Sequence, residues 1–249
     1  MLKSWRYGLN AACLALSLTM SAQTQGMDYA YDEEEPLYSD GTAAQQVSDP
    51  WEGFNRASFA FNEFLDKWIL RPVAKGYVTV TPDPVEGLVS NFFTNLSEIR
   101  NVANSLLQLK FADAGSSTGR FLVNSTVGML GLIDVGTALG WDYKYNDFGM
   151  TLANWSVPAG PYVVVPFLGP RTVQTAAGIV PDAYASPITY VTPEHDRYLL
   201  AGADVIRVRA ALLKKETLIV GDKYSFIRDA YLQRREFLSS GRKVVEDEF

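Results

Sequence analysis

The feature that most constrains the fold is a helical repeat of apolar residues that begins directly after Asp49-Pro50. Aromatic and aliphatic side chains recur there at steps of three and four residues, the spacing of one face of an α-helix. The stripe consists of Trp51, Phe54, Phe61, Leu65 and Trp68, widened by Ala57 and Phe64. Asp49 is suited to cap this helix and Pro50 to its first position, and the helix is expected to end near Leu70, before Pro72. Such a stripe serves either as a core anchor or as a membrane-surface face.

The same period recurs in the other long apolar segments, so the sequence predicts an all-α fold. Pro82 and Pro84 are placed to open a helix that runs through Phe93, and Asn95 or Ser97 is placed to cap the next one. That next helix carries a stripe of Ile99, Val102, Ala103, Leu106 and Leu107. The other expected helices cover residues 117–127, with Phe121 and Leu122 facing inward, 172–179, the segment from about Pro193, and 224–239 with Gly241 after its end.

One block of the sequence does not follow the helical period. Residues 147–170 are rich in glycine, proline and aromatic side chains, and within them residues 163–165 are valines with strand propensity. Prolines on both sides exclude a central strand of a sheet, so an extended apolar loop is expected. Another glycine-rich segment, 129–139, contains Gly136 and is followed by Gly140. This pair of glycines predicts close packing between helices.

The first residues have the order of a secretory signal peptide: positive charge at Lys3 and Arg6, an apolar stretch, then small residues around Ala22. The apolar stretch falls short of the ~20 residues that a membrane-spanning helix needs, and it lacks the amphipathic pattern of the alternative, a buried N-terminal helix. We therefore expect export and cleavage near Ala22. Cys13, the single cysteine, lies inside this leader. Lipidation of Cys13 is not expected, because Asn10 stands where a bacterial lipobox has a leucine-like residue.

An acidic linker separates the leader from the folded part. Residues 23–48 contain the run Asp32-Glu33-Glu34-Glu35 and too few apolar residues to offset the entropy of ordering. The predicted organisation is a signal peptide (1–22), a flexible linker (23–48), a helical domain (49–241) and a flexible tail (242–249). Removal of the leader leaves 20 of the 22 basic residues against 28 acidic ones, a net charge of −8. This charge argues against nucleic acid as a partner, because such binding depends on Lys and Arg neutralising phosphates.

One catalytic pattern is present. Gly115-Ser116-Ser117-Thr118-Gly119 fits the G-x-S-x-G nucleophile elbow, and Asp182 and His195 follow in the chain order of a hydrolase triad. The elbow requires a strand directly before the serine, whereas residues 106–110 resemble the end of a helix. The cluster is therefore expected to be a loop that ends in a helix cap. His195 is the single histidine and is expected at the surface, which excludes a histidine-based metal site. We predict neither an enzyme nor a cofactor.

Aromatic residues are more abundant than a single helical core requires. They include Phe54, Phe61, Phe92, Phe93, Trp155, Tyr162 and Phe167. At a bilayer interface, amphipathic helices bury such groups in lipid, and Trp and Tyr prefer the level of the headgroups. Lipid is therefore the predicted ligand class, and internal packing of each aromatic side chain is the alternative.

Four motifs occur in a fixed order along the chain. They are Asp49-Pro50-Trp51-Glu52-Gly53-Phe54-Asn55-Arg56 followed by Phe61-Asn62; Arg120-Phe121-Leu122-Val123-Asn124-Ser125-Thr126-Val127-Gly128; Phe148-Gly149-Met150-Thr151-Leu152 with Trp155 and the block from Gly160 to Pro170; and Arg228-Asp229-Ala230-Tyr231-Leu232-Gln233-Arg234-Arg235. Together they resemble the MlaA (VacJ) family of Gram-negative outer-membrane lipid-transport proteins, over about residues 49–239.

The resemblance implies an α-helical, ring-like protein in the inner leaflet of the outer membrane. That family removes phospholipid mislocalised to the outer leaflet, passes it to a periplasmic carrier protein, associates with trimeric porins and does not hydrolyse lipid. Many of its members are lipoproteins, and the poor lipobox at Cys13 departs from this pattern. The residues expected to contact the membrane or to line the lipid path are Trp51, Phe54, Asn55, Phe61, Asn62, Trp155, Gly160, Pro161, Tyr162, Pro166 and Phe167. The alternatives are a porin-associated structural protein and a lipid hydrolase that uses Ser117 and His195.

Overall fold

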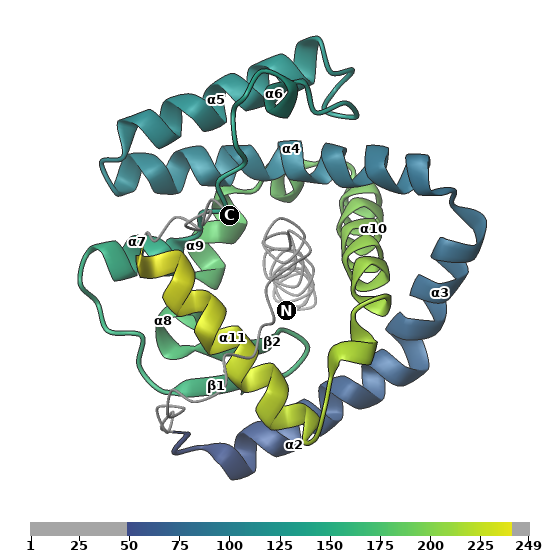
Figure 1. Ribbon diagram of the computed structural model, residues 1–249, viewed down its shortest axis with the longest axis vertical. Helices are drawn as coiled ribbons and strands as arrows, with labels where there is room; N and C mark the ends of the chain where they lie inside the picture. The colour runs from purple at the N-terminus through teal and green to yellow at the C-terminus, as the bar shows by residue number, and fades with distance from the viewer. Residues whose placement is uncertain (1–48, 241–249) are drawn as a thin grey trace, which may run out of the picture.

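The structure is a computed structural model that describes residues 49–240, and most of these are helical. The elements are α2 (Glu52–Leu65), the π-helix η1 (Asp66–Leu70), α3 (Arg71–Val80), α4 (Asp83–Leu107), α5 (Phe111–Thr126), α6 (Val135–Ala138), α7 (Phe148–Asn154), β1 (Tyr162–Val165), β2 (Gly169–Thr172), α8 (Val173–Ala177), α9 (Ile179–Ala185), η2 (Pro187–Tyr190), α10 (Glu194–Leu213), η3 (Glu216–Leu218) and α11 (Lys223–Ser240). Figure 1 shows these helices arranged around a ring, with α10 alongside α3 and α5 on the outside of α4. The expected all-α, ring-like fold is confirmed.

The first helix continues well beyond its expected end. α2, η1 and α3 form one helical run to Val80, so the predicted end near Leu70 is wrong. Pro72 falls in the first turn of α3, directly after η1. In a π-turn the N–H bonds the carbonyl five residues back, as Arg71 does with Asp66, and this local rearrangement lets the helix pass the proline. The run also begins at Glu52 after Trp51, and not with Asp49 as the cap.

α4 is a single helix of 25 residues, so the predicted break at Asn95 or Ser97 is wrong. Both residues had been assigned to a cap because short polar side chains are favoured there. In the structure, polar residues instead recur along one buried face of α4 at helical spacing. The buried positions of this helix are Phe93, Thr94, Asn95, Glu98, Arg100, Asn101, Asn104 and Ser105.

Many polar side chains of this protein are buried and many apolar ones are exposed, the reverse of the pattern in an ordinary soluble domain. In α5, Ser117, Arg120 and Asn124 are buried, whereas Leu122 is 56% exposed. The predicted inward orientation is therefore wrong for Leu122, whereas Phe121 is half-buried. The helix itself is present. α4 and α5 pack through their polar faces, which leaves apolar side chains on the outside of the ring.

The valine run forms a strand and not a loop. β1 pairs with β2 in antiparallel register, with Tyr162 opposite Thr172 and Val165 opposite Gly169. Within the described part of the chain these two strands make a sheet of their own, which explains why flanking prolines are tolerated: each strand has a free edge. The turn between them places Phe167 (φ 66°) and Gly169 (φ 76°) in the left-handed region.

Within residues 49–240, two small apolar clusters form the hydrophobic core. One contains Phe93, Ile188 and Ala201 and joins α4, η2 and α10. The other joins Tyr162 and Val164 of β1 to two tyrosines of α11. α10 and α11 cover the segments predicted for them, whereas the single helix expected over 172–179 is divided into α8 and α9 at Gly178.

The two glycines predicted to allow close packing have different roles. A Cβ on Gly136 would lie 2.9 Å from the Arg120 Cγ, so close packing is confirmed at that position. Gly140 has open space around it and a φ of 80°, so it serves a turn.

No helix within residues 49–240 is long and apolar enough to cross a bilayer. The predicted signal peptide, Ala22, Cys13, the linker over 23–48, Gly241 and the tail over 242–249 lie outside the described residues.

Candidate lipid-contact surface and the polar sites behind it

α2 and η1 present an aromatic face on the outside of the molecule. Trp51 is 45% exposed, Phe54 55% and Phe61 40%. The face continues through Phe64 and Trp68, which are 59% and 65% exposed. The structure thus places the predicted membrane-contact aromatics of this helix at the surface and not in the core. Their contact with lipid stays a prediction.

The two asparagines of the same helix have another role, because they lie against the β-hairpin. Asn55 is fully buried and donates to the Tyr162 carbonyl at 3.1 Å, while its Oδ1 accepts from Val164 N–H at 2.8 Å. Asn62 donates to the Val165 carbonyl at 3.1 Å and accepts from Phe167 N–H at 2.6 Å. These bonds satisfy the backbone groups on the free edge of β1. The structure therefore shows both residues as supports that position the hairpin on α2.

Tyr162 is also a support, since its side chain is only 1% exposed. Its ring packs edge-on against Tyr224, with 6.3 Å between the ring centroids, and lies tilted against Tyr231 at 6.2 Å. Burial, followed by the nearby tyrosines and Asp49, raises the pKa of Tyr162 well above its ordinary value. This residue attaches the hairpin to α11 and does not belong to the exposed aromatic face.

The remaining predicted residues of the block lie around the hairpin, except Trp155, which contacts α4 and α7. Phe167 is 45% exposed and packs edge-on against Phe61 at 5.0 Å, so it extends the aromatic face of α2. Trp155 is 49% exposed, and its indole N–H donates to the Leu107 carbonyl at 3.2 Å. Pro166 is exposed, Pro161 is half-buried, and Gly160 adopts a φ of 69°.

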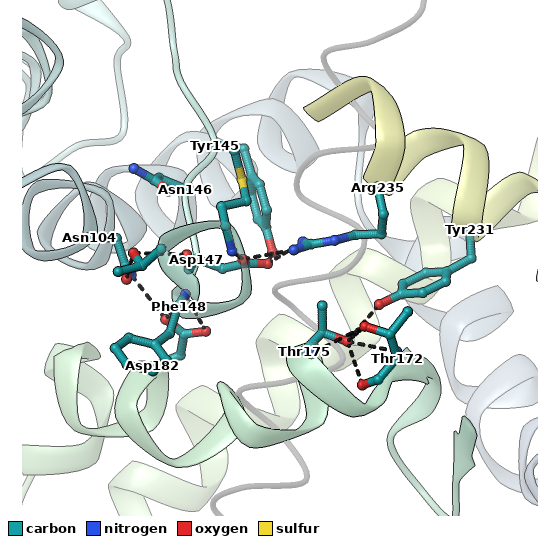
Figure 2. A network of polar contacts seen from close by, with 12 residues as sticks. Asn104, Tyr145, Asn146, Asp147, Phe148, Thr172, Thr175, Asp182, Tyr231 and Arg235 are labelled. Carbon is teal, nitrogen blue, oxygen red and sulfur yellow. Dashed lines mark hydrogen bonds and ion pairs between the residues drawn. The ribbon is translucent and has the colours of Figure 1, made fainter. Parts of the chain in front are cut away.

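A buried carboxylate at the start of α7 binds α11 to the rest of the ring. Figure 2 shows Asp147 between Tyr145 and Arg235. Its carboxylate accepts from the Arg235 guanidinium at 2.5 and 3.2 Å, from the Tyr145 hydroxyl at 2.9 Å and from Met150 N–H at 2.7 Å. Burial would raise the pKa of Asp147, but Arg235 and these hydrogen bonds hold it far below its ordinary value. The residue is therefore an anion that caps α7 and binds α11.

Asp182 is the second carboxylate of this network. It accepts from Phe148 N–H at 2.9 Å and from the Asn104 amide at 3.0 Å (Figure 2). Burial and the charge of Asp147 raise the pKa of Asp182 to about 7. Asp182 therefore links α9 to α7 and α4.

A second polar site joins α4, α5 and α6. Arg120 is 1% exposed and pairs with Glu98 at 2.7 Å and with Asp134 at 2.9 Å. It also donates to Thr137 Oγ1 at 3.0 Å and to the Trp141 carbonyl. Asp134 caps α6 through its bond to Thr137 N–H. These bonds hold α5 on the outer side of the ring.

The residues of the hydrolase alternative do not form a nucleophile elbow. Ser117 lies within α5 at 2% exposure, so the cluster over 115–119 is neither a strand-to-helix turn nor the loop that we expected. His195 is at the surface as predicted, with 73% of its side chain exposed, and its Nε2 lies 3.1 Å from Asp196. Across residues 49–240, no group of three metal-ligating side chains could hold a metal ion.

Comparison with known sequences identifies the family to which this chain belongs. The sequence pattern of the family described as MlaA lipoprotein matches residues 47–238 of the chain. The chain belongs to the MlaA lipoprotein family. The resemblance inferred from the four sequence motifs is thereby confirmed.

Proteins from several bacteria are similar to this chain over most of their length. The intermembrane phospholipid transport system lipoprotein MlaA of Escherichia coli (strain K12) is 34% identical over 218 residues, which cover 84% of this chain and 86% of the relative. An uncharacterized protein of Rickettsia prowazekii (strain Madrid E) is 36% identical over 199 residues, which cover 77% and 78%. A solved structure from work on the structural basis for maintenance of bacterial outer membrane lipid asymmetry has a TM-score of 0.66 and 34% identity, and the match covers 77% of this chain and 99% of that one.

Proposed function

We propose that this protein is the outer-membrane component of an intermembrane phospholipid transport system. It removes mislocalised phospholipid from the outer leaflet and passes it to a periplasmic carrier protein, which keeps the membrane asymmetric. The names of the relatives from Escherichia coli and Shigella flexneri support this assignment. The observation on this chain that carries it is the distribution of buried side chains: many polar ones are buried between helices, while many aromatic and aliphatic ones are exposed.

The same observation supports a position within one leaflet. Exposed apolar helix faces are stable in the interface of a bilayer, where affinity grows with the apolar area that is buried. We propose that the ring lies on the periplasmic side of the outer membrane. We further propose a trimeric porin as its neighbour there.

The manner of attachment is part of the proposal. We expect the leader to be removed near Ala22 and the protein to be held by its own aromatic faces, without an acyl chain on Cys13. Mass spectrometry of the mature N-terminus should find a free amino group near Gln23. An acylated N-terminal cysteine would contradict this part of the proposal and leave the transport role intact.

Transport is tested in a strain that lacks this protein. Surface labelling of phospholipid should show an excess in the outer leaflet, and the full-length chain should restore the normal level. Phe54→Ser should restore it poorly, because Phe54 is 55% exposed on the aromatic face, whereas Phe54→Leu should restore it. A normal outer leaflet in the deletion strain would refute the proposal.

Two measurements separate transport from the alternatives. If the protein were only a porin-associated structural component, Phe54→Ser would leave lipid asymmetry unchanged as long as porin co-purification is retained. If it were a lipid hydrolase, Ser117→Ala and His195→Ala would both abolish complementation. We expect Phe54→Ser to lose lipid asymmetry while it still co-purifies with the porin. We expect Ser117→Ala and His195→Ala to complement the deletion strain fully.

A further inference from the structure

A pocket of about 460 Å³ lies where α2, η1 and α3 face the chain between α10 and α11. In Figure 1 this is the corner of the ring at which the connection after α10 approaches α2. Its volume is within the range of pockets that bind small molecules or cofactors, about 300–1,000 Å³. The walls combine apolar side chains, among them Phe64, Trp68 and Ile219, with charged ones.

The acidic groups of this pocket are already bound to cations. Glu63 pairs with Lys223 at 2.5 Å. Asp66 pairs with Arg209 at 2.5 Å. Glu216 pairs with both Arg71 and Arg209. None of the three carboxylates is therefore left to neutralise a further positive charge.

Lys67 supplies that further charge. Counting the lining residues and Arg209 behind them gives four basic groups against three acidic ones, and hence one excess positive charge. Within residues 49–240 Lys67 forms no ion pair, and its Nζ lies 5.6 Å from the centre of the Trp68 ring. The π-turn that contains both residues leaves their side chains exposed, and such turns are frequent at functional sites.

An unpaired ammonium group beside an exposed tryptophan suits the boundary between headgroups and acyl chains. Tryptophan prefers this level of a bilayer, and lysine binds phosphate as a point charge. The adjacent Phe64 and Trp68 are 59% and 65% exposed, so they offer apolar surface to the glycerol and the first acyl carbons. A small inorganic anion would interact with the Lys67 ammonium group alone and would leave Phe64 and Trp68 exposed to water.

We propose that the pocket is an accessory phospholipid site, in which Lys67 binds the lipid phosphate and Phe64 and Trp68 contact the glycerol and acyl chains. The inference rests on the proposed function only in taking the protein to lie at a membrane. It assigns to this corner of the ring a lipid that docks from the surrounding leaflet, separate from the passage of lipid through the ring.

The test uses the full-length protein purified in a mild detergent. Binding of short-chain phosphatidylglycerol is measured by native mass spectrometry for the wild type and for Lys67→Gln. Loss of one charge-assisted contact should weaken binding about tenfold. Lys75→Gln is the matched control, since Lys75 is an exposed lysine of α3 that forms no ion pair within the described residues, and it should bind as the wild type does. Both variants should melt at the temperature of the wild type.

Two further probes identify the source of the phosphate. Diacylglycerol, which lacks the phosphate, should bind weakly and equally to the wild type and to Lys67→Gln. Inorganic phosphate at the same concentration should not compete with the lipid. Equal binding of phosphatidylglycerol to Lys67→Gln and the wild type would overturn the site, and competition by inorganic phosphate would overturn its assignment to lipid.

The lipid-binding measurement and the deletion-strain experiment test different proposals, so either proposal can fail alone. A normal outer leaflet in that strain combined with lysine-dependent lipid binding would refute transport and keep the site. Restored asymmetry combined with unchanged binding by Lys67→Gln would refute the site and keep transport.

Discussion

Replacement of Arg120 by methionine should destabilise the protein strongly, because it leaves the Glu98 carboxylate without its cation. Both side chains are almost completely buried, at 1% and 0% exposure, and their atoms are 2.7 Å apart. Removing one partner of a buried ion pair costs about 3–5 kcal/mol. For a domain of this size each kcal/mol lowers the melting temperature by about 2–4 °C, so we expect a decrease of about 6–20 °C. Thermal unfolding in detergent micelles, followed by near-UV circular dichroism, measures it.

The decrease should depend on pH in a defined direction. Burial already raises the pKa of Glu98 above its ordinary value, although Asn101 and Arg120 act against this shift. Without Arg120 the pKa rises further, so the folded variant binds a proton that the unfolded chain has released above about pH 4. A group whose folded pKa is raised contributes stability that is lost as pH rises through that pKa. The variant should therefore be closer to the wild type at pH 5 than at pH 8.

The double variant Glu98→Gln/Arg120→Met identifies the cause. It removes the buried Glu98 carboxylate that lacks a cation. At pH 8 it should recover at least half of the decrease in melting temperature, and its melting temperature should depend little on pH. If Arg120→Met melted within about 2 °C of the wild type, or if the double variant were as unstable as the single one, the reasoning about the buried charge would be refuted.

Three further predictions follow from the described contacts. Asn62→Leu removes two hydrogen bonds to the hairpin, at 3.1 and 2.6 Å, and should cost about 1–3 kcal/mol in urea unfolding; an unchanged midpoint would contradict the supporting role. Gly136→Ala places a Cβ 2.9 Å from Arg120 Cγ and should cost about 1–3 kcal/mol, whereas Gly76→Ala, with nothing within 4 Å in the middle of a helix, should be stabilising by about 0.4–1 kcal/mol; equal melting temperatures for the two would count against close packing. Since the pKa of Asp182 is raised to about 7, above the value of about 4 in an unfolded chain, its contribution to stability falls as pH rises from about 4 to 7. Asp182→Asn should flatten that slope in melting temperatures recorded from pH 4 to 8, and an unchanged slope would exclude this residue as its source.

The helices were predictable because their apolar residues recur at the period of a helix. The same periodicity does not tell which face of a helix is buried. Leu122 was assigned to the interior because apolar faces normally form the core, yet it is 56% exposed while Arg120 is at 1%. The polar residues at three- and four-residue steps on α4 were the available signal for this inversion, and they were interpreted as caps.

The candidate site was predictable only in part, for a related reason. Phe54 and Phe61 were expected to be exposed and are. Asn55 and Asn62 lie seven residues apart, and this spacing could have indicated a single helix face that binds an extended segment. Tyr162 could not have been assigned to the core, since its neighbours belong to a helix more than sixty residues further along the chain.

The sequence by itself determined the helical class of the fold, the aromatic character of the first helix and the family, because each depends on local spacing or on motifs. The tertiary structure decided which faces meet. Asp147 binds Arg235 across 88 residues and Asn55 binds the hairpin across 107, and such contacts arise only when the ring closes. A charged side chain is tolerated inside only where its partners surround it, and for that reason only the assembled ring shows which polar faces are buried and which apolar side chains stay exposed.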